Sequence, residues 1–151
     1  MSRTQIDAPP AAGWPDRAGG GGALRHGLGW LLVFGALNAF AGGYYAMAGA
    51  SGIPLAWLRS SPFRSYFVPG VILFVVVGGS LLAGGVAVLT RARLAPLAAY
   101  AAGVVLLVWL GVELIIIGYV SWMQPATAAV GLIILLLSWR LAGARVDGPS
   151  S

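Results

Sequence analysis

Few side chains in this sequence can do chemistry, and Glu113 is the most informative because it stands alone in a long apolar segment. A charged side chain at the centre of a membrane helix costs about 2.5 to 3.5 kcal/mol, so it normally faces the protein interior and marks a partner or a pathway. Three roles are open for Glu113: a structural ion pair with Arg59 or Arg64, a proton-carrying or ligand-binding acid, or a side chain that extends to the membrane interface.

The two arginines lie in a connection, residues 49–68, that interleaves aromatic and basic side chains. Aromatic rings bury their bodies in the head-group layer while guanidinium groups stay hydrated, so this pattern predicts a partly embedded external loop. The loop has two possible roles, an interfacial cap with a structural purpose or a lid over a site between helices. Its candidate residues beside the arginines are Trp57, Phe63 and Tyr66.

Asn38 and Ser80 are further polar side chains inside apolar segments, and both have small residues three or four positions away. Small residues let a neighbouring backbone approach closely, and a polar side chain then forms a hydrogen bond across the contact. We therefore expect the two faces to be complementary packing surfaces rather than ligand sites. They contain Gly35, Ala41, Gly42 and Tyr45 beside Asn38, and Ala83, Gly84 and Ala87 beside Ser80.

The sequence offers little for metal, cofactor or covalent chemistry. It has no cysteine, which excludes disulfides and thiolate ligands. One histidine, His26, and one intramembrane glutamate are too few for a typical metal cage, so we expect His26 to contact lipid head groups. The glycines form no phosphate-binding loop, and no nucleophile and base pair can be named. We expect no metal, no cofactor and no enzymatic activity.

The composition identifies the class of protein that must position these residues. Of the 151 residues, 59% are hydrophobic and only 9% are charged, with a mean hydropathy of +0.88. This is too little charge to solvate the surface of a water-soluble domain. The sequence therefore predicts an all-α polytopic membrane protein, a four-transmembrane-helix bundle. The predicted helices are residues 28–48, 69–89, 96–120 and 125–141.

The predicted transmembrane domain covers residues 23–142, with flexible cytoplasmic tails at 1–22 and 143–151. The first tail combines Pro, Gly and Ala with scattered charges, so it cannot bury enough apolar surface to offset its ordering entropy. The first apolar segment could instead be a secretory signal cleaved after Ala48, but it is longer than a signal core. The last two helices are joined by too few residues for anything except an antiparallel hairpin.

The arginines predict the orientation of the bundle. Seven of the nine lie on the side of both termini, and only Arg59 and Arg64 lie on the other side. Arginine is enriched in cytoplasmic segments, so we expect both termini in the cytoplasm and the protein in the inner (plasma) membrane. The net charge of +5 does not indicate nucleic-acid binding, because the arginines lie at the ends of apolar segments, where they meet lipid head groups. The seven are Arg3, Arg17, Arg25, Arg91, Arg93, Arg140 and Arg145.

Two stretches of the sequence stand out. The first contains Gly52-Ile53-Pro54, Trp57-Leu58, Ser61-Pro62-Phe63, Tyr66 and Pro69-Gly70, and the second contains Trp109, Glu113, Ile117-Gly118, Ser121-Trp122 and Gln124-Pro125. Together they resemble a group of small, uncharacterised bacterial four-helix integral membrane proteins, over roughly residues 27–140. The resemblance implies the same topology and no particular activity or cofactor. Both stretches fall at the external ends of helices, as Glu113 does, so that half of the bundle is the expected place for a site.

These observations lead to two functional hypotheses. The first is a non-catalytic integral membrane protein, either an accessory subunit or a small-ligand or lipid-binding module, whose small-residue faces bind another membrane protein or a second copy. The second is a small transporter or proton-coupled carrier that uses Glu113. Transport normally needs several polar groups along one path, and this chain offers few.

Overall fold

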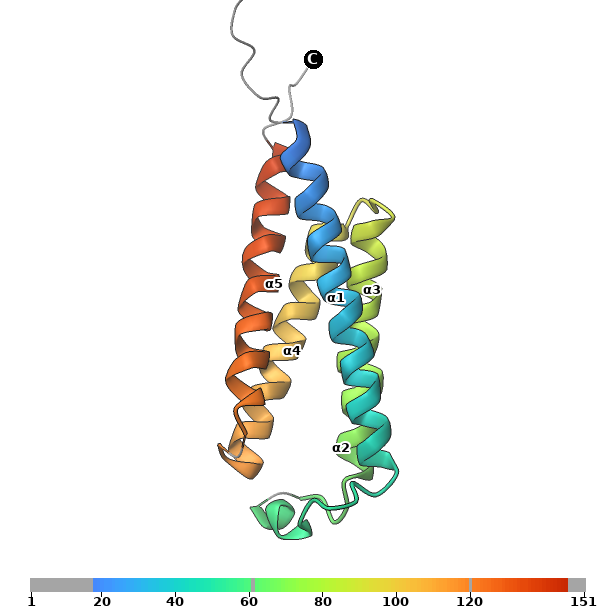
Figure 1. Ribbon diagram of the computed structural model, residues 1–151, viewed down its shortest axis with the longest axis vertical. Helices are drawn as coiled ribbons and strands as arrows, with labels where there is room; N and C mark the ends of the chain where they lie inside the picture. The colour runs from blue at the N-terminus through green and yellow to red at the C-terminus, as the bar shows by residue number, and fades with distance from the viewer. Residues whose placement is uncertain (1–17, 61, 120, 147–151) are drawn as a thin grey trace, which may run out of the picture.

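The computed structural model describes residues 18–60, 62–119 and 121–146, and its regular elements are all helices (Figure 1). Within these residues, four helices are long and apolar enough to cross a membrane, which confirms the predicted all-helical fold. Each of the four runs antiparallel to the one that precedes it in the chain. The first helix begins and the last helix ends at one end of the bundle, here called the termini end. The opposite end is the loop end.

Three of the four long helices are uninterrupted. They are α1 (Ala18–Met47), α4 (Ala95–Ile117) and α5 (Met123–Val146). The second crossing joins three pieces end to end: α2 (Phe67–Ile72), the π-helical segment η2 (Leu73–Gly78) and α3 (Gly79–Leu89). A short 3-10 helix, η1 (Leu55–Ser60), lies in the connection between α1 and α2.

The helix ends differ from the predicted ones by three residues or more at three places. Helix α1 begins at Ala18, inside the predicted tail, and His26 Nδ1 lies 2.8 Å from the Gly22 carbonyl one turn earlier, which helps to hold this glycine-rich turn. Helix α4 ends at Ile117 because Gly118 has φ 71° and ψ −167°, a conformation that glycine adopts readily and other residues do not. Helix α5 continues to Val146, past the predicted end. Residues 1–17 and 147–151, the rest of the predicted tails, lie outside the described residues.

Helix α1 packs against the second crossing through glycines on both sides of the contact. A Cβ atom on Gly43 would lie 2.8 Å from the Gly70 carbonyl oxygen, so the two backbones touch near the loop end. Nearer the termini end, a Cβ on Gly29 would lie 2.5 Å from a Leu89 methyl carbon. Glycine alone permits these approaches. We call this contact the glycine seam, made by Gly29, Gly43, Gly70, Gly78 and Gly85.

The remaining contacts close the four helices into a ring, in which α3 packs on α4, α4 on α5, and α5 on α1. Small residues again set the spacing: Gly84 of α3 faces Ala102 of α4, and Gly131 of α5 lies under Leu107. The largest fully buried side chains are aliphatic and come from α1, α3, α5 and η2. They include Leu28, Leu32, Leu81, Ile134 and Val77.

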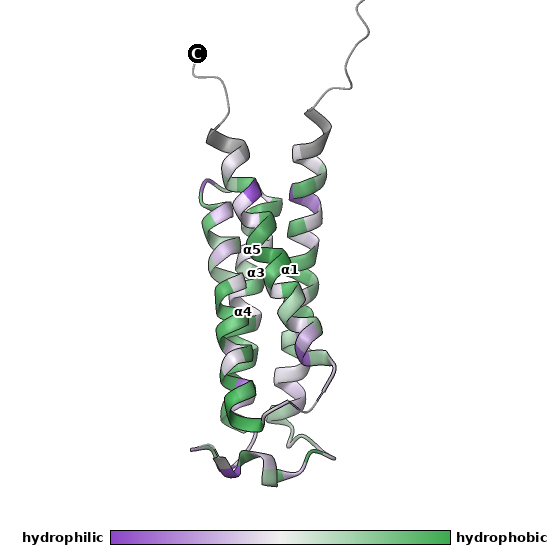
Figure 2. Ribbon diagram, turned by 90° about the vertical axis from the view of Figure 1, so that its left-hand side faces the viewer, coloured by the Kyte–Doolittle hydropathy of each residue, from purple (hydrophilic) through white to green (hydrophobic). Residues whose placement is uncertain are grey.

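The outer surface of the helices is as apolar as the interior. Hydrophobic residues cover the helices along most of their length (Figure 2), and many large ones point outward. Phe34 is 71% exposed and Ile115 is 83% exposed. A helical bundle in water presents polar residues on its outer face, so this surface suits an apolar surrounding.

Candidate functional site

Glu113 continues the packed side of α4. The buried residues Leu106 and Leu110 precede it at helical spacing, and Glu113 is itself partly buried, about one turn before the helix ends. Its carboxylate therefore faces the bundle interior near the loop end. Within the described part of the chain, it forms neither a hydrogen bond nor an ion pair.

Arg59 and Arg64 are both exposed, and neither is paired with Glu113. The expected ion pair is not formed with either arginine, and for Arg59 the geometry of η1 gives the reason. Leu58 is buried, with 6% of its surface exposed, and η1 contacts α4. Because Leu58 turns inward, the adjacent Arg59 projects away from the bundle.

The loop that carries these arginines crosses the loop end of the bundle (Figure 1) and is tied down at both of its ends. The Tyr45 hydroxyl on α1 donates a hydrogen bond to the Ser51 carbonyl, and the Tyr66 hydroxyl, just before α2, donates to the Pro54 carbonyl at 2.8 Å. Partial burial raises the pKa of Tyr66. The other predicted aromatic residues, Trp57 and Phe63, are exposed and partly buried respectively.

Asn38 and Ser80 do not form a common packing surface. Asn38 is exposed, on the side of α1 opposite the residues that form the glycine seam, and its amide makes no hydrogen bond with a described residue. Ser80 is partly buried and donates a hydrogen bond to the Val77 carbonyl of its own crossing at 3.0 Å. Gly35 and Gly42 do approach the second crossing, at Leu81 and Leu73, but Asn38 itself is turned away from that contact and is exposed.

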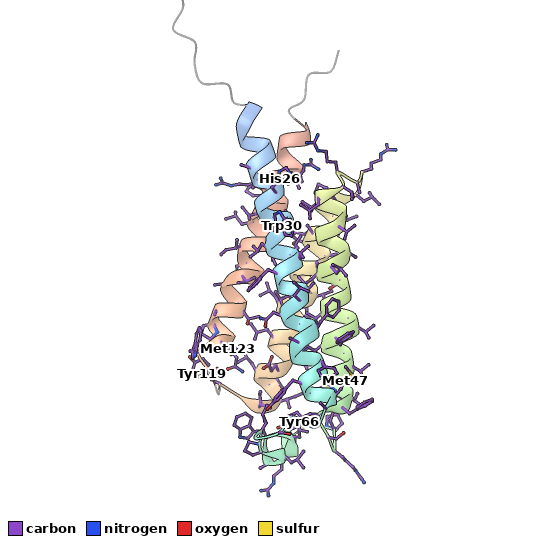
Figure 3. All side chains as sticks on the ribbon, turned by 45° about the vertical axis from the view of Figure 1, so that its right-hand side comes forward. His26, Trp30, Met47, Tyr66, Tyr119 and Met123 are labelled. Carbon is purple, nitrogen blue, oxygen red and sulfur yellow. The ribbon has the colours of Figure 1, made fainter. Side chains whose placement is uncertain are left out.

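His26 lies at the termini end of α1, far along the bundle from Tyr66 and Met47 (Figure 3). It is exposed. Among the described residues, no three His, Cys, Asp or Glu side chains are grouped closely enough to hold a metal ion.

Gln124 is a polar residue whose role the sequence did not reveal. Its side chain is 5% exposed, and its Nε2 donates a hydrogen bond at 3.0 Å to the Gly118 carbonyl, where the chain leaves α4. The amide therefore bonds the carbonyl that the end of α4 leaves without a helical partner. The sequence did contain a signal for this bond, because a glutamine stands in the short connection between two apolar segments.

Neither the inward Glu113 nor the outward Asn38 has a hydrogen-bond or ion-pair partner among the described residues. The first can bind a proton or a cation, and the second can exchange hydrogen bonds with another amide or hydroxyl.

No family model, curated protein or solved structure matches the chain.

Proposed function

We propose that this chain is a non-catalytic integral membrane protein that serves as an accessory subunit, with α1 as the helix that contacts the partner protein. Its four long helices cross the inner (plasma) membrane, and both termini lie in the cytoplasm. The four apolar helices and their apolar outer surface support insertion. The arginine bias toward the termini end supports the orientation.

The observation that carries the accessory role is the outward position of Asn38. It lies nine residues before the end of α1 at Met47, about 14 Å along the helix axis. A side chain as short as asparagine cannot reach the interface from this depth. An amide in contact with hydrocarbon is costly unless it is hydrogen-bonded, so a second helix with a donor or acceptor should cover it.

The residues around Asn38 fit such a contact. Phe34 and Leu37 are large and exposed, so they can insert between side chains of a second helix. Ala41 is small, so the backbone of that helix can approach closely beside it. In membranes, helices associate through small residues and interhelical hydrogen bonds because lipid gives no hydrophobic driving force between them. This face offers both features.

Photo-crosslinking tests the proposal. A photoreactive phenylalanine at Phe34 in the full chain, illuminated in the membranes of the native host, should give a discrete protein adduct that mass spectrometry identifies. Asn38→Leu should reduce that adduct about threefold to tenfold, as expected for one interhelical hydrogen bond. The same crosslinker at Val108, which is exposed on α4, is the matched control and should give lipid adducts.

The outcomes separate the alternatives. An adduct with a different membrane protein supports the accessory role, and an adduct with a second copy of this chain replaces it with a homo-oligomer. Lipid adducts alone at position 34, or an adduct unchanged by Asn38→Leu, would contradict the role of this face.

Proton-coupled transport is the second candidate function, and the inward Glu113 without an ion pair is the observation that favours it. The full chain in vesicles with an internal pH-sensitive dye should then collapse an imposed pH gradient. Glu113→Gln should abolish that flux. No flux above that of empty vesicles would exclude this candidate.

The orientation has its own test, because the chain contains no cysteine to give background labelling. Ser65→Cys, in the loop, should react with an impermeant thiol reagent on intact cells. Thr90→Cys, at the termini end, should be protected. The reverse pattern would overturn the cytoplasmic placement of the termini.

A further inference from the structure

A groove of about 370 Å³ opens on the outside of the bundle between α4 and α5, at the termini end. Its volume lies in the range of small-molecule sites. Its walls are mostly apolar, and aromatic side chains stand at its edge: Tyr100 is 47% exposed and Trp139 is 71% exposed. The lining includes Arg93, Leu97, Tyr100, Ser138, Trp139 and Ala142.

The polar groups of the groove are few and donate hydrogen bonds. The guanidinium of Arg93 carries a positive charge, and the Tyr100 hydroxyl bonds to no described residue. Ser138 is buried and already donates to the Ile134 carbonyl at 2.6 Å, so it serves its own helix. The polar lining of the groove is therefore one arginine, which also makes another interaction within the protein, and one hydroxyl above apolar walls.

The described charges around the groove are positive. Four arginines with described side chains lie at the termini end, whereas the acid with a described side chain, Glu113, lies near the loop end. Helix α4 also begins here without a side-chain cap, so the positive end of its dipole adds to the field. The four arginines are Arg25, Arg91, Arg93 and Arg140.

We propose that this groove binds one anionic phospholipid of the leaflet at the termini end. The phosphate lies beside Arg93 and Tyr100, and an acyl chain lies along Leu97 and Trp139. An anionic head group matches the charge, an acyl chain matches the apolar walls, and tyrosine and tryptophan occupy the depth at which the two meet. The inference rests on the membrane insertion proposed above, because the groove then opens directly to the bilayer.

Native mass spectrometry of the full chain in mild detergent tests the proposal. The protein is titrated with dioleoyl phosphatidylglycerol or dioleoyl phosphatidylcholine, which share acyl chains and differ in charge. The first phosphatidylglycerol should bind more tightly than the first phosphatidylcholine. Arg93→Gln should weaken phosphatidylglycerol about fivefold and leave phosphatidylcholine unchanged, since one basic residue near the surface contributes about that factor.

Two further variants keep the test decisive. Arg59→Gln, an exposed arginine at the loop end, is the matched control and should retain the preference for phosphatidylglycerol. Arg93→Glu places an acid just before α4, which the helix dipole favours, so this variant should fold while losing the preference. Circular dichroism confirms the helical content of each variant.

Three results would overturn the lipid site. They are equal binding of the two lipids by the unaltered chain, an equal loss of preference in Arg59→Gln and Arg93→Gln, and displacement of bound lipid by inorganic phosphate at equal concentration. Failure of insertion is distinguishable, because a chain outside the bilayer would bind neither lipid and would not float with vesicles. Failure of the accessory role leaves lipid binding unaffected.

Discussion

The glycine seam and the loop end use different interactions. In the seam, α1 and the second crossing touch through glycine backbones and apolar side chains, as at Gly43 and Gly70. At the loop end, polar side chains such as Tyr66 and Gln124 bond to single carbonyl oxygens of nearby turns. The seam therefore determines how closely the helices approach, whereas the loop end carries Glu113 and the side-chain hydrogen bonds that hold its turns. Substitutions in the two regions should have separable effects.

The largest effect is expected in the seam. Gly43→Val should destabilise the fold by about 3 kcal/mol, because even its first carbon would lie 2.8 Å from backbone atoms of the second crossing and the helices must separate. Thermal unfolding followed by circular dichroism in mild detergent measures the loss. Gly27→Val, on the same helix with open space around it, should change stability by only a few tenths of a kcal/mol. Equal effects in the two variants would show that the seam is not a close contact.

A smaller effect is expected at Gly118, where the loop end meets α4. Gly118→Ala should cost about 1 to 3 kcal/mol through backbone strain, although no atom lies within 4 Å of the added carbon. Gly111→Ala, which is also unhindered but helical, should instead gain about 0.5 to 1 kcal/mol. The same unfolding assay compares them. A neutral Gly118→Ala would mean that the turn relaxes easily.

The smallest effect on stability is expected at Glu113. Glu113→Gln preserves the shape of the side chain and removes no ion pair, so the unfolding free energy should change by less than about 0.5 kcal/mol. The double variant Arg59→Gln and Arg64→Gln should change the unfolding free energy equally little. A loss above about 1 kcal/mol in Glu113→Gln would reveal a structural partner for the carboxylate and would weaken its assignment as a site for a proton or cation.

The sequence predicted the four helices because apolar segments of membrane-crossing length have few alternatives. It predicted that Glu113 faces the inner side of its helix, because a charged side chain in contact with lipid is costly. It did not predict the direction of Asn38. Gly35 and Gly42 do lie against Leu81 and Leu73 of the second crossing, but Asn38, three or four residues away on the same helix, is exposed. The ion pair with Arg59 failed because burial of Leu58, which the loop sequence does not reveal, turns the arginine away.

The π-helical segment could not be read from the sequence either, because Leu73–Gly78 is apolar on every side and shows no helical period. Each of its hydrogen bonds spans one residue more than in an α-helix. One turn can therefore lose a residue and become α-helical while Gly70 and Gly85, on either side, keep their places against α1. Evolutionary changes of length in this crossing are thus expected to concentrate within residues 73–78, where a single-residue deletion preserves both halves of the contact with α1.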